Sequence, residues 1–152
     1  LDTSGCVPSD LFDFFIDKVD LFLYDLKLVD NSLHKKYTGS SNKNILENLG
    51  NLAHKQKKVI IRFPLIPAFT DSEKNLVQVA SFVKDLQVLT DIQILPYHKT
   101  ASEKYRRIKK VNKMAGVEPP SNQKIMEVER IFLSFGLNIL PDSPEEEIKK
   151  EN

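Results

Sequence analysis

Cysteine is nearly absent from this chain of 152 residues, which contains only Cys6. One thiol excludes an internal disulfide, and a single thiolate cannot by itself hold an iron–sulfur cluster. A chain with so little cysteine is typical of a reducing compartment, so we expect a cytoplasmic protein. Free cysteines mostly behave as small apolar side chains, and we therefore predict that Cys6 is buried.

A large net charge and long apolar runs are missing as well. The chain has 22 basic and 21 acidic residues and a net charge of +1. This leaves no overall field to attract a polyanion, so we expect no nucleic-acid binding. No apolar run approaches the roughly 20 residues that span a membrane, so we expect no membrane insertion. With 41% hydrophobic and 28% charged residues, the composition is that of one globular domain with a sizeable core.

The most informative stretch runs from Val19 to Lys27 and is apolar until Asp25. As a strand it places Leu21, Leu23, Asp25 and Lys27 on one face, and Phe22, Tyr24 and Leu26 on the other. A strand that is apolar on both faces is typical of a parallel sheet covered by helices. It ends in an acid and a base at the carboxyl edge, where such sheets bind ligands.

The rest of the chain alternates between strand and helix patterns. We predict helices that begin at Ser9 or Asp10, at the Asp30–Ser32 cap and at Asn42, and a helix that follows the capping-box pattern Thr70–Glu73. Further strands are predicted at 58–66 and 91–95, then a helix that Gly136 ends and an edge strand at 137–140. This alternation predicts an α/β fold with parallel strands and outer helices, in a barrel or a doubly wound sheet.

Two segments are predicted to lie outside the core. The basic segment from Lys104 to Lys113 is typical of a solvated helix face, and residues 141–152 have almost no apolar content and are predicted to be a frayed tail. At the other end, Leu1–Gly5 has the pattern of a strand that runs into a loop. We therefore expect the chain to begin within a fold, as in a truncated protein or an isolated domain.

Polar residues cluster at the predicted strand ends: Asp2, Asp25 with Lys27, Arg62 and His98. Each has an ordinary structural explanation, such as a local ion pair for Asp25 and Lys27. Arg62 can lie along apolar neighbours, and His98 can bond a loop carbonyl. Taken together, with two cations among them, these strand ends suit a small ligand that carries a carboxylate.

Several short motifs occur in a fixed order and carry a resemblance to a known family. Leu1-Asp2-Thr3-Ser4-Gly5 is similar to an L-D-T-N/S-G strand end, and Asp25-Leu26-Lys27 to a D-x-K signature. The others are Thr38-Gly39 with Ser41-Asn42, Ile61-Arg62, Pro67 with Thr70-Asp71, Leu95-Pro96-Tyr97-His98 and Gly116-Val117-Glu118-Pro119-Pro120. The chain resembles the radical S-adenosylmethionine enzymes that activate glycyl radical enzymes, above all those that act on pyruvate formate-lyase.

The resemblance implies a partial (β/α) TIM-type barrel, of which residues 1–140 would be the C-terminal part. It also implies that S-adenosylmethionine is held by Asp2, Thr3, Asp25, Lys27, Arg62 and His98, with a monovalent cation at Asp2 and Asp25. The family's C-x3-C-x2-C motif, which binds a 4Fe-4S cluster, is absent here, so we expect no catalytic residue in this segment and no activity from it alone. The implied partners are a glycyl radical enzyme, such as pyruvate formate-lyase, and an electron donor such as flavodoxin or ferredoxin.

Two alternatives stay open at this point. One is another barrel enzyme in which Lys27 forms a Schiff base with a carbonyl substrate, which would require the neutral amine. The other is a non-catalytic interaction module that keeps the fold without the chemistry. Residues 102–115 depart from the family pattern, so the sequence does not indicate which partner would be bound.

Overall fold

The computed structural model describes residues 1–99 and 116–141. Its strands form one parallel sheet in the order β1-β2-β3-β4-β5. The strands are β1 (Asp2–Thr3), β2 (Phe22–Asp25), β3 (Val59–Leu65), β4 (Asp91–Pro96) and β5 (Asn138–Leu140). The helices are α1 (Ser9–Ile16), α2 (Asn31–Thr38), α3 (Lys43–His54), α4 (Glu73–Asp85) and α6 (Asn122–Ser134).

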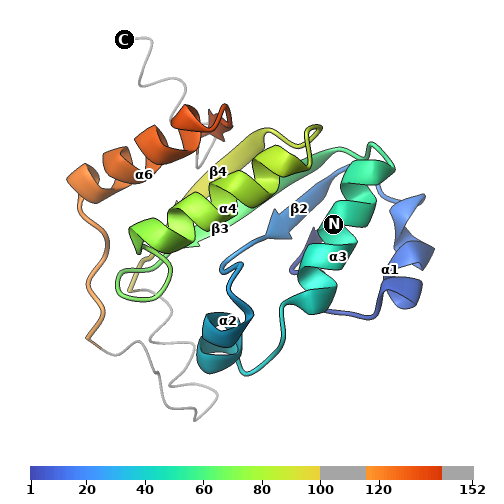
Figure 1. Cartoon of the computed structure of the whole chain (residues 1–152), viewed down its shortest axis with the longest axis horizontal. Helices are drawn as coiled ribbons and strands as arrows, with labels where there is room; N and C mark the ends of the chain where they lie inside the picture. The colour runs from blue at the N-terminus through green and yellow to red at the C-terminus, as the bar shows by residue number, and fades with distance from the viewer. Residues whose placement is uncertain (100–115, 142–152) are drawn as a thin grey trace.

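The strand order decides between the two architectures that the sequence left open. Each strand pairs with the next one along the chain, so the winding never reverses direction as it does in a doubly wound sheet. Right-handed crossovers that always advance in one direction place their helices on one face of the sheet. Helices α1, α3, α4 and α6 accordingly lie together in front of the strands (Figure 1). The fold is the predicted α/β arrangement of a partial barrel.

Burial alternates along the strands because only one face is packed against helices. Phe22 and Tyr24 of β2, and Ile61 and Phe63 of β3, are fully buried against the helix layer, and Phe63 meets Phe132 of α6 edge-on at 5.3 Å. The residues between them are half-buried on the opposite face. We expected both faces of β2 to be covered, but within the described residues the helix layer covers one.

The turn after β1 depends on a glycine that packs against Tyr24. The Tyr24 hydroxyl donates a hydrogen bond to the Ile45 carbonyl at 2.7 Å, and Gly5 lies directly against it with φ at +62°. A Cβ atom at Gly5 would come within 1.7 Å of the Tyr24 oxygen. Gly5 is therefore required both by its left-handed backbone and by the close approach.

Two helix starts test the sequence-based capping predictions. The α2 cap is confirmed, because Asp30 Oδ1 accepts from the backbone N–H groups of Ser32 and Leu33. At α4 the predicted Thr70–Glu73 box is wrong. Ser72 is the N-cap and accepts from the Asn75 N–H, whereas the Thr70 hydroxyl donates to the Pro64 carbonyl at 2.7 Å. The Thr70 hydroxyl thus bonds the end of β3 rather than capping α4.

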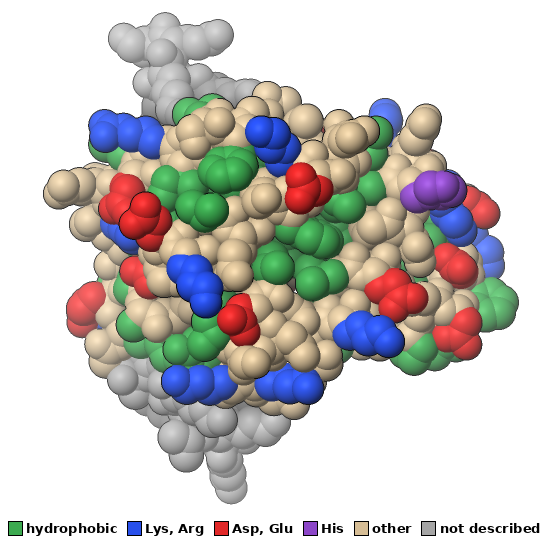
Figure 2. Space-filling view, in the orientation of Figure 1, with side chains coloured by type: hydrophobic (Ala, Val, Ile, Leu, Met, Phe, Trp, Pro, Cys, Tyr) green, Lys and Arg blue, Asp and Glu red, His purple; other side chains and the backbone are tan. Residues whose placement is uncertain are grey.

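The helix-covered surface agrees with the near-zero net charge. Figure 2 shows basic, acidic and hydrophobic side chains intermixed on this face rather than gathered into a patch of one sign. None of the helices within residues 1–99 and 116–141 has the length and apolar composition needed to cross a membrane. The predicted basic segment Lys104–Lys113 and residues 142–152 of the predicted tail lie outside the described residues.

Candidate functional site

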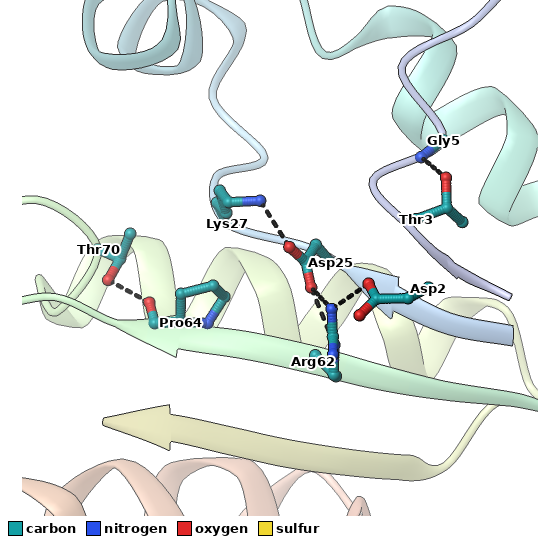
Figure 3. A network of polar contacts seen from close by, with 8 residues as sticks. All are labelled: Asp2, Thr3, Gly5, Asp25, Lys27, Arg62, Pro64 and Thr70. Carbon is teal, nitrogen blue, oxygen red and sulfur yellow. Dashed lines mark hydrogen bonds and ion pairs between the residues drawn. The ribbon is translucent and has the colours of Figure 1, made fainter. Parts of the chain in front are cut away.

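A row of polar side chains crosses the sheet on the face opposite the helices. Asp25 of β2 is paired in register with Arg62 of β3, which is paired in turn with Gln93 of β4. Residues in register on parallel strands point to the same face. Their chain neighbours, including Tyr24 and Ile61, are buried on the helix side, so these three point away from it. In Figure 3 the side chains stand in front of the strands and the helix beside β3 passes behind them.

Arg62 joins two carboxylates into one cluster. Its Nε and Nη2 atoms donate to Asp25 Oδ1 at 3.0 and 2.8 Å, and Nη2 also donates to Asp2. Lys27 Nζ donates to the other Asp25 oxygen, Oδ2, at 3.0 Å. We call Asp2, Asp25, Lys27 and Arg62 the strand-end network (Figure 3). It contains two cations and two anions in alternation and therefore has no net charge.

The network is partly shielded from solvent, most strongly at its centre. The side-chain exposure is 17% for Arg62, 23% for Asp25, 31% for Lys27 and 63% for Asp2. Partial burial acts to lower the pKa of Arg62, but hydrogen bonds and charge from Asp25, and then from Asp2, outweigh it and raise this pKa above its ordinary value. The guanidinium is therefore a permanent cation.

The loop that carries Lys27 is held by two asparagine side chains, one immediately before α3 and one in the first turn of α4. Asn42 Nδ2 donates to the carbonyls of Leu28 and Val29 at 3.0 and 2.7 Å. Asn75 Nδ2 donates to the Lys27 carbonyl at 3.0 Å. Both asparagines are buried, so these bonds are protected from competition with water. The backbone of Lys27 is thus fixed although its side chain is partly exposed.

Comparison with known proteins gives three informative relatives, although no protein-family model matches the chain. The chain is 34% identical over 140 residues to the trans-4-hydroxy-L-proline dehydratase activating enzyme of Clostridioides difficile, covering 91% of the chain and 46% of that protein. It is 32% identical over 141 residues to the indoleacetate decarboxylase activating enzyme of Tractidigestivibacter scatoligenes, covering 92% and 44%. The pyruvate formate-lyase 1-activating enzyme of Escherichia coli (strain K12) is 30% identical over 142 residues, covering 92% and 58%.

Comparison with solved structures points to the same group of activating enzymes. A domain of pyruvate-formate lyase-activating enzyme from Bacteroides vulgatus ATCC 8482 matches with a TM-score of 0.75 and 25% identity, covering 93% of this chain and 79% of that one. The chain is a homologue of the glycyl radical enzyme activating enzymes, in the radical S-adenosylmethionine superfamily. A radical SAM methyltransferase from Sphaerobacter thermophilus shares the fold, with a TM-score of 0.67 at 16% identity over 92% of this chain and 38% of that one.

This homologue of the activating enzymes spans about half the length of the curated relatives it matches, between 44% and 58%. The sequence contains one cysteine, and it lies in the exposed loop after β1, so the prediction that Cys6 is buried is wrong. A single exposed thiol does not fit the three-cysteine cluster motif expected from the family. Within residues 1–99 and 116–141 no group of three histidine, cysteine or acidic residues is placed to hold a metal ion.

The structure unites part of the predicted site and leaves part of it separate. Asp2, Asp25, Lys27 and Arg62 meet as described. Thr3 lies next to Asp2 on β1, but its hydroxyl accepts from the Gly5 N–H at 3.0 Å. The guanidinium of Arg62 stands between Asp2 and Asp25, where we predicted a monovalent cation. That cation stays a prediction.

His98 is not part of the strand-end network, whose bonds join only Asp2, Asp25, Lys27 and Arg62. It is exposed, two residues beyond the end of β4, and it lines a hollow of about 710 Å³ together with residues of α6 and β5, among them Glu129 and Ile139. None of the four network residues lines this hollow. His98 shares the carboxyl edge of the sheet with Asp25, and its predicted contact with the same ligand stays a prediction.

Sequence reasoning missed two buried asparagines: Asn75, which holds the loop of Lys27, and Asn48, whose Nδ2 donates to the carbonyls of Gly5 and Val7 in the loop after β1, at 2.9 Å each. Asn48 and Asn75 are almost completely buried within otherwise apolar helix faces. Asn48 lies three residues after Ile45 and four before Leu52, and Asn75 lies four residues before Val79. A small amide at a core position of a helix is a usable signal, because a buried amide has to find partners.

Proposed function

We propose that the strand-end network binds the amino-acid portion of S-adenosylmethionine in a protein that activates a glycyl radical enzyme. The observation that carries this proposal is the alternation of charge on the open face of the sheet. The amino-acid portion of the ligand is a zwitterion, with a carboxylate and an ammonium on one carbon. Lys27 and Arg62 suit the carboxylate, whereas Asp2 and Asp25 suit the ammonium.

The cations keep donors for such a ligand after pairing with Asp25. A lysine ammonium has three N–H groups, and the contact with Asp25 uses one of them. Arg62 has five, and its bonds to Asp25 and Asp2 involve Nε and Nη2. Because these salt bridges already hold both cations in place, binding requires little rearrangement. The contact with Asp25 fits Lys27 as a binding cation, and no described feature calls for it as a Schiff-base nucleophile.

These residues do not supply every part of the proposed activity. Bound S-adenosylmethionine supplies the radical chemistry of the family, and this chain's residues bind and orient it. One cysteine does not fit the family cluster, so we expect residues 1–152 alone neither to bind a 4Fe-4S cluster nor to cleave S-adenosylmethionine. The proposed partners are a glycyl radical enzyme and an electron donor such as flavodoxin or ferredoxin. The three relatives above are named for three different target enzymes, so we infer none in particular.

The test is calorimetric titration of the natural protein with S-adenosylmethionine and with 5′-methylthioadenosine, which lacks the amino-acid portion. Lys27→Ala and Arg62→Ala should each weaken S-adenosylmethionine binding about tenfold or more, because each removes a charge-assisted hydrogen bond of about 1.5–3 kcal/mol. Binding of 5′-methylthioadenosine should change less than about twofold. If His98 contacts the nucleoside, His98→Ala should weaken both ligands.

Lys57→Ala is the matched control, because Lys57 also forms a salt bridge but with Asp17, away from the network. It should leave both affinities unchanged. Equal losses for the two ligands in Lys27→Ala and Arg62→Ala would refute a contact with the amino-acid portion. Unchanged affinity in both variants would remove the network from the site.

A further inference from the structure

Asn75 occupies an unusual position at the start of α4. It is 1% exposed, and its single Nδ2 atom donates to two carbonyls, those of Lys27 at 3.0 Å and Thr70 at 2.9 Å. Lys27 follows β2 and Thr70 follows β3, so the amide bridges two neighbouring strand-end loops. An amide nitrogen carries two N–H groups and can serve both carbonyls, whereas a hydroxyl has one donor.

The bridge continues to the strand that carries Arg62. Thr70 donates its hydroxyl to the carbonyl of Pro64, two residues after Arg62 on β3, and accepts from the Ile66 N–H at 2.8 Å. The backbone N–H of Leu26 bonds the Arg62 carbonyl directly at 3.0 Å. Residues 26 and 27 are therefore tied to β3 twice, once through the sheet and once through Asn75 and Thr70.

The oxygen of the Asn75 side chain, unlike its nitrogen, does not account for an amide at this position. Asn75 Oδ1 is buried and has no hydrogen-bond partner within the described residues. An unpaired buried acceptor is destabilising, and an apolar side chain would avoid it. The amide is therefore explained by its two donated bonds rather than by its oxygen.

We infer that Asn75 is a positioning residue, which sets the Lys27 ammonium at its distance from Arg62 and so tunes the cation pair for a carboxylate. The effect on ligand affinity rests on the function proposed above. The effect on the loop does not, since it follows from the hydrogen bonds alone. We expect Asn75 to act only through the backbone of Lys27, to whose carbonyl it donates.

The loop is tested by hydrogen exchange of the natural protein measured by mass spectrometry. Asn75→Ala should speed amide exchange in residues 26–29 by about tenfold or more relative to residues 59–65, because the second tie to β3 is lost. Val79→Ala is the matched control, one turn further along α4, fully buried and apolar. It should speed amide exchange across the domain, without a larger increase in residues 26–29 than in residues 59–65. Equal patterns in the two variants would overturn the inference.

Affinity is tested with S-adenosylmethionine as the probe, in the wild type and in a Lys27→Ala background. Asn75→Ala should weaken binding about fivefold in the wild type and less than about twofold once Lys27 is removed, because it acts through that side chain. Equal effects in both backgrounds would refute positioning through Lys27. If Lys27→Ala itself leaves affinity unchanged, the proposed function fails, and the exchange pattern alone decides the role of Asn75.

A second, more conservative variant keeps the inference testable if Asn75→Ala does not fold. Asn75→Ser keeps one donor in a smaller side chain and should give exchange in residues 26–29 between those of the wild type and Asn75→Ala. Exchange as slow as in the wild type would show that one bond suffices and that the double bridge is not what holds the loop.

Discussion

Replacing Arg62 tests the strand-end network without any ligand, because Arg62 bonds both of its carboxylates. Arg62→Ala deletes two hydrogen bonds to Asp25, whose side chain is 23% exposed, and one to Asp2, which is 63% exposed. The exposed contact with Asp2 should contribute little. Hydrogen bonds to a partly buried carboxylate contribute about 1.5–3 kcal/mol, and Lys27 still compensates part of the charge of Asp25. We therefore expect the free energy of unfolding to fall by about 2 kcal/mol.

The assay is urea unfolding followed by far-ultraviolet circular dichroism, since the chain has no tryptophan. Lys57→Ala, whose partner Asp17 is 83% exposed, should lower the free energy of unfolding much less than Arg62→Ala does. A double-mutant cycle with Asp25→Ala should give a coupling of about 1–3 kcal/mol between Arg62 and Asp25. A loss in Arg62→Ala no larger than that in Lys57→Ala, together with zero coupling, would refute the view that the network is a structural unit.

Three further predictions concern stability. Burial raises the pKa of Tyr24 above its ordinary value of 10.0, with a smaller contribution from Cys6. The neutral phenol therefore stabilises the fold fully below pH 10, and this stabilisation is lost as the pH rises further, because the unfolded chain ionises first. In urea unfolding at rising pH, Tyr24 should contribute a slope of about −1.4 kcal/mol in the free energy of unfolding per pH unit. A Tyr24→Phe variant should lack this contribution. Gly5→Ala should lower the free energy of unfolding by about 3 kcal/mol, because the new Cβ would clash with Tyr24. The double variant Gly5→Ala with Tyr24→Phe should recover part of this loss. A nearly unchanged stability in Gly5→Ala would contradict the packing. Asp30→Ala should lower the melting temperature through loss of about 1 kcal/mol of capping, and an unchanged temperature would contradict the cap.

Several elements followed from local sequence alone. The helix from Asn31 to Thr38 has an acidic cap before it and Gly39 after it, and it lies where these signals predict. The strands at 22–25 and 59–65 are apolar runs with one charged residue each, Asp25 and Arg62, and they lie within the predicted ranges. Both kinds of signal depend on neighbours within a few residues, so no tertiary information is needed to read them. The capping box at Thr70 failed because that hydroxyl already accepts from the Ile66 N–H and donates to the Pro64 carbonyl, and Ser72 caps the helix instead.

The sequence by itself determined the alternation of strand and helix, the polar strand ends and the ordered motifs that resemble the family. It did not decide whether Arg62 lies along apolar neighbours or pairs with acids, because Asp2 and Asp25 lie 60 and 37 residues away from it along the chain. Strand register set that choice by bringing Asp25 opposite Arg62. Only the tertiary structure placed His98 at the hollow beside α6 and β5, and Asn75 between two loops. Such contacts depend on how far each crossover advances around the sheet, and no local pattern encodes that distance.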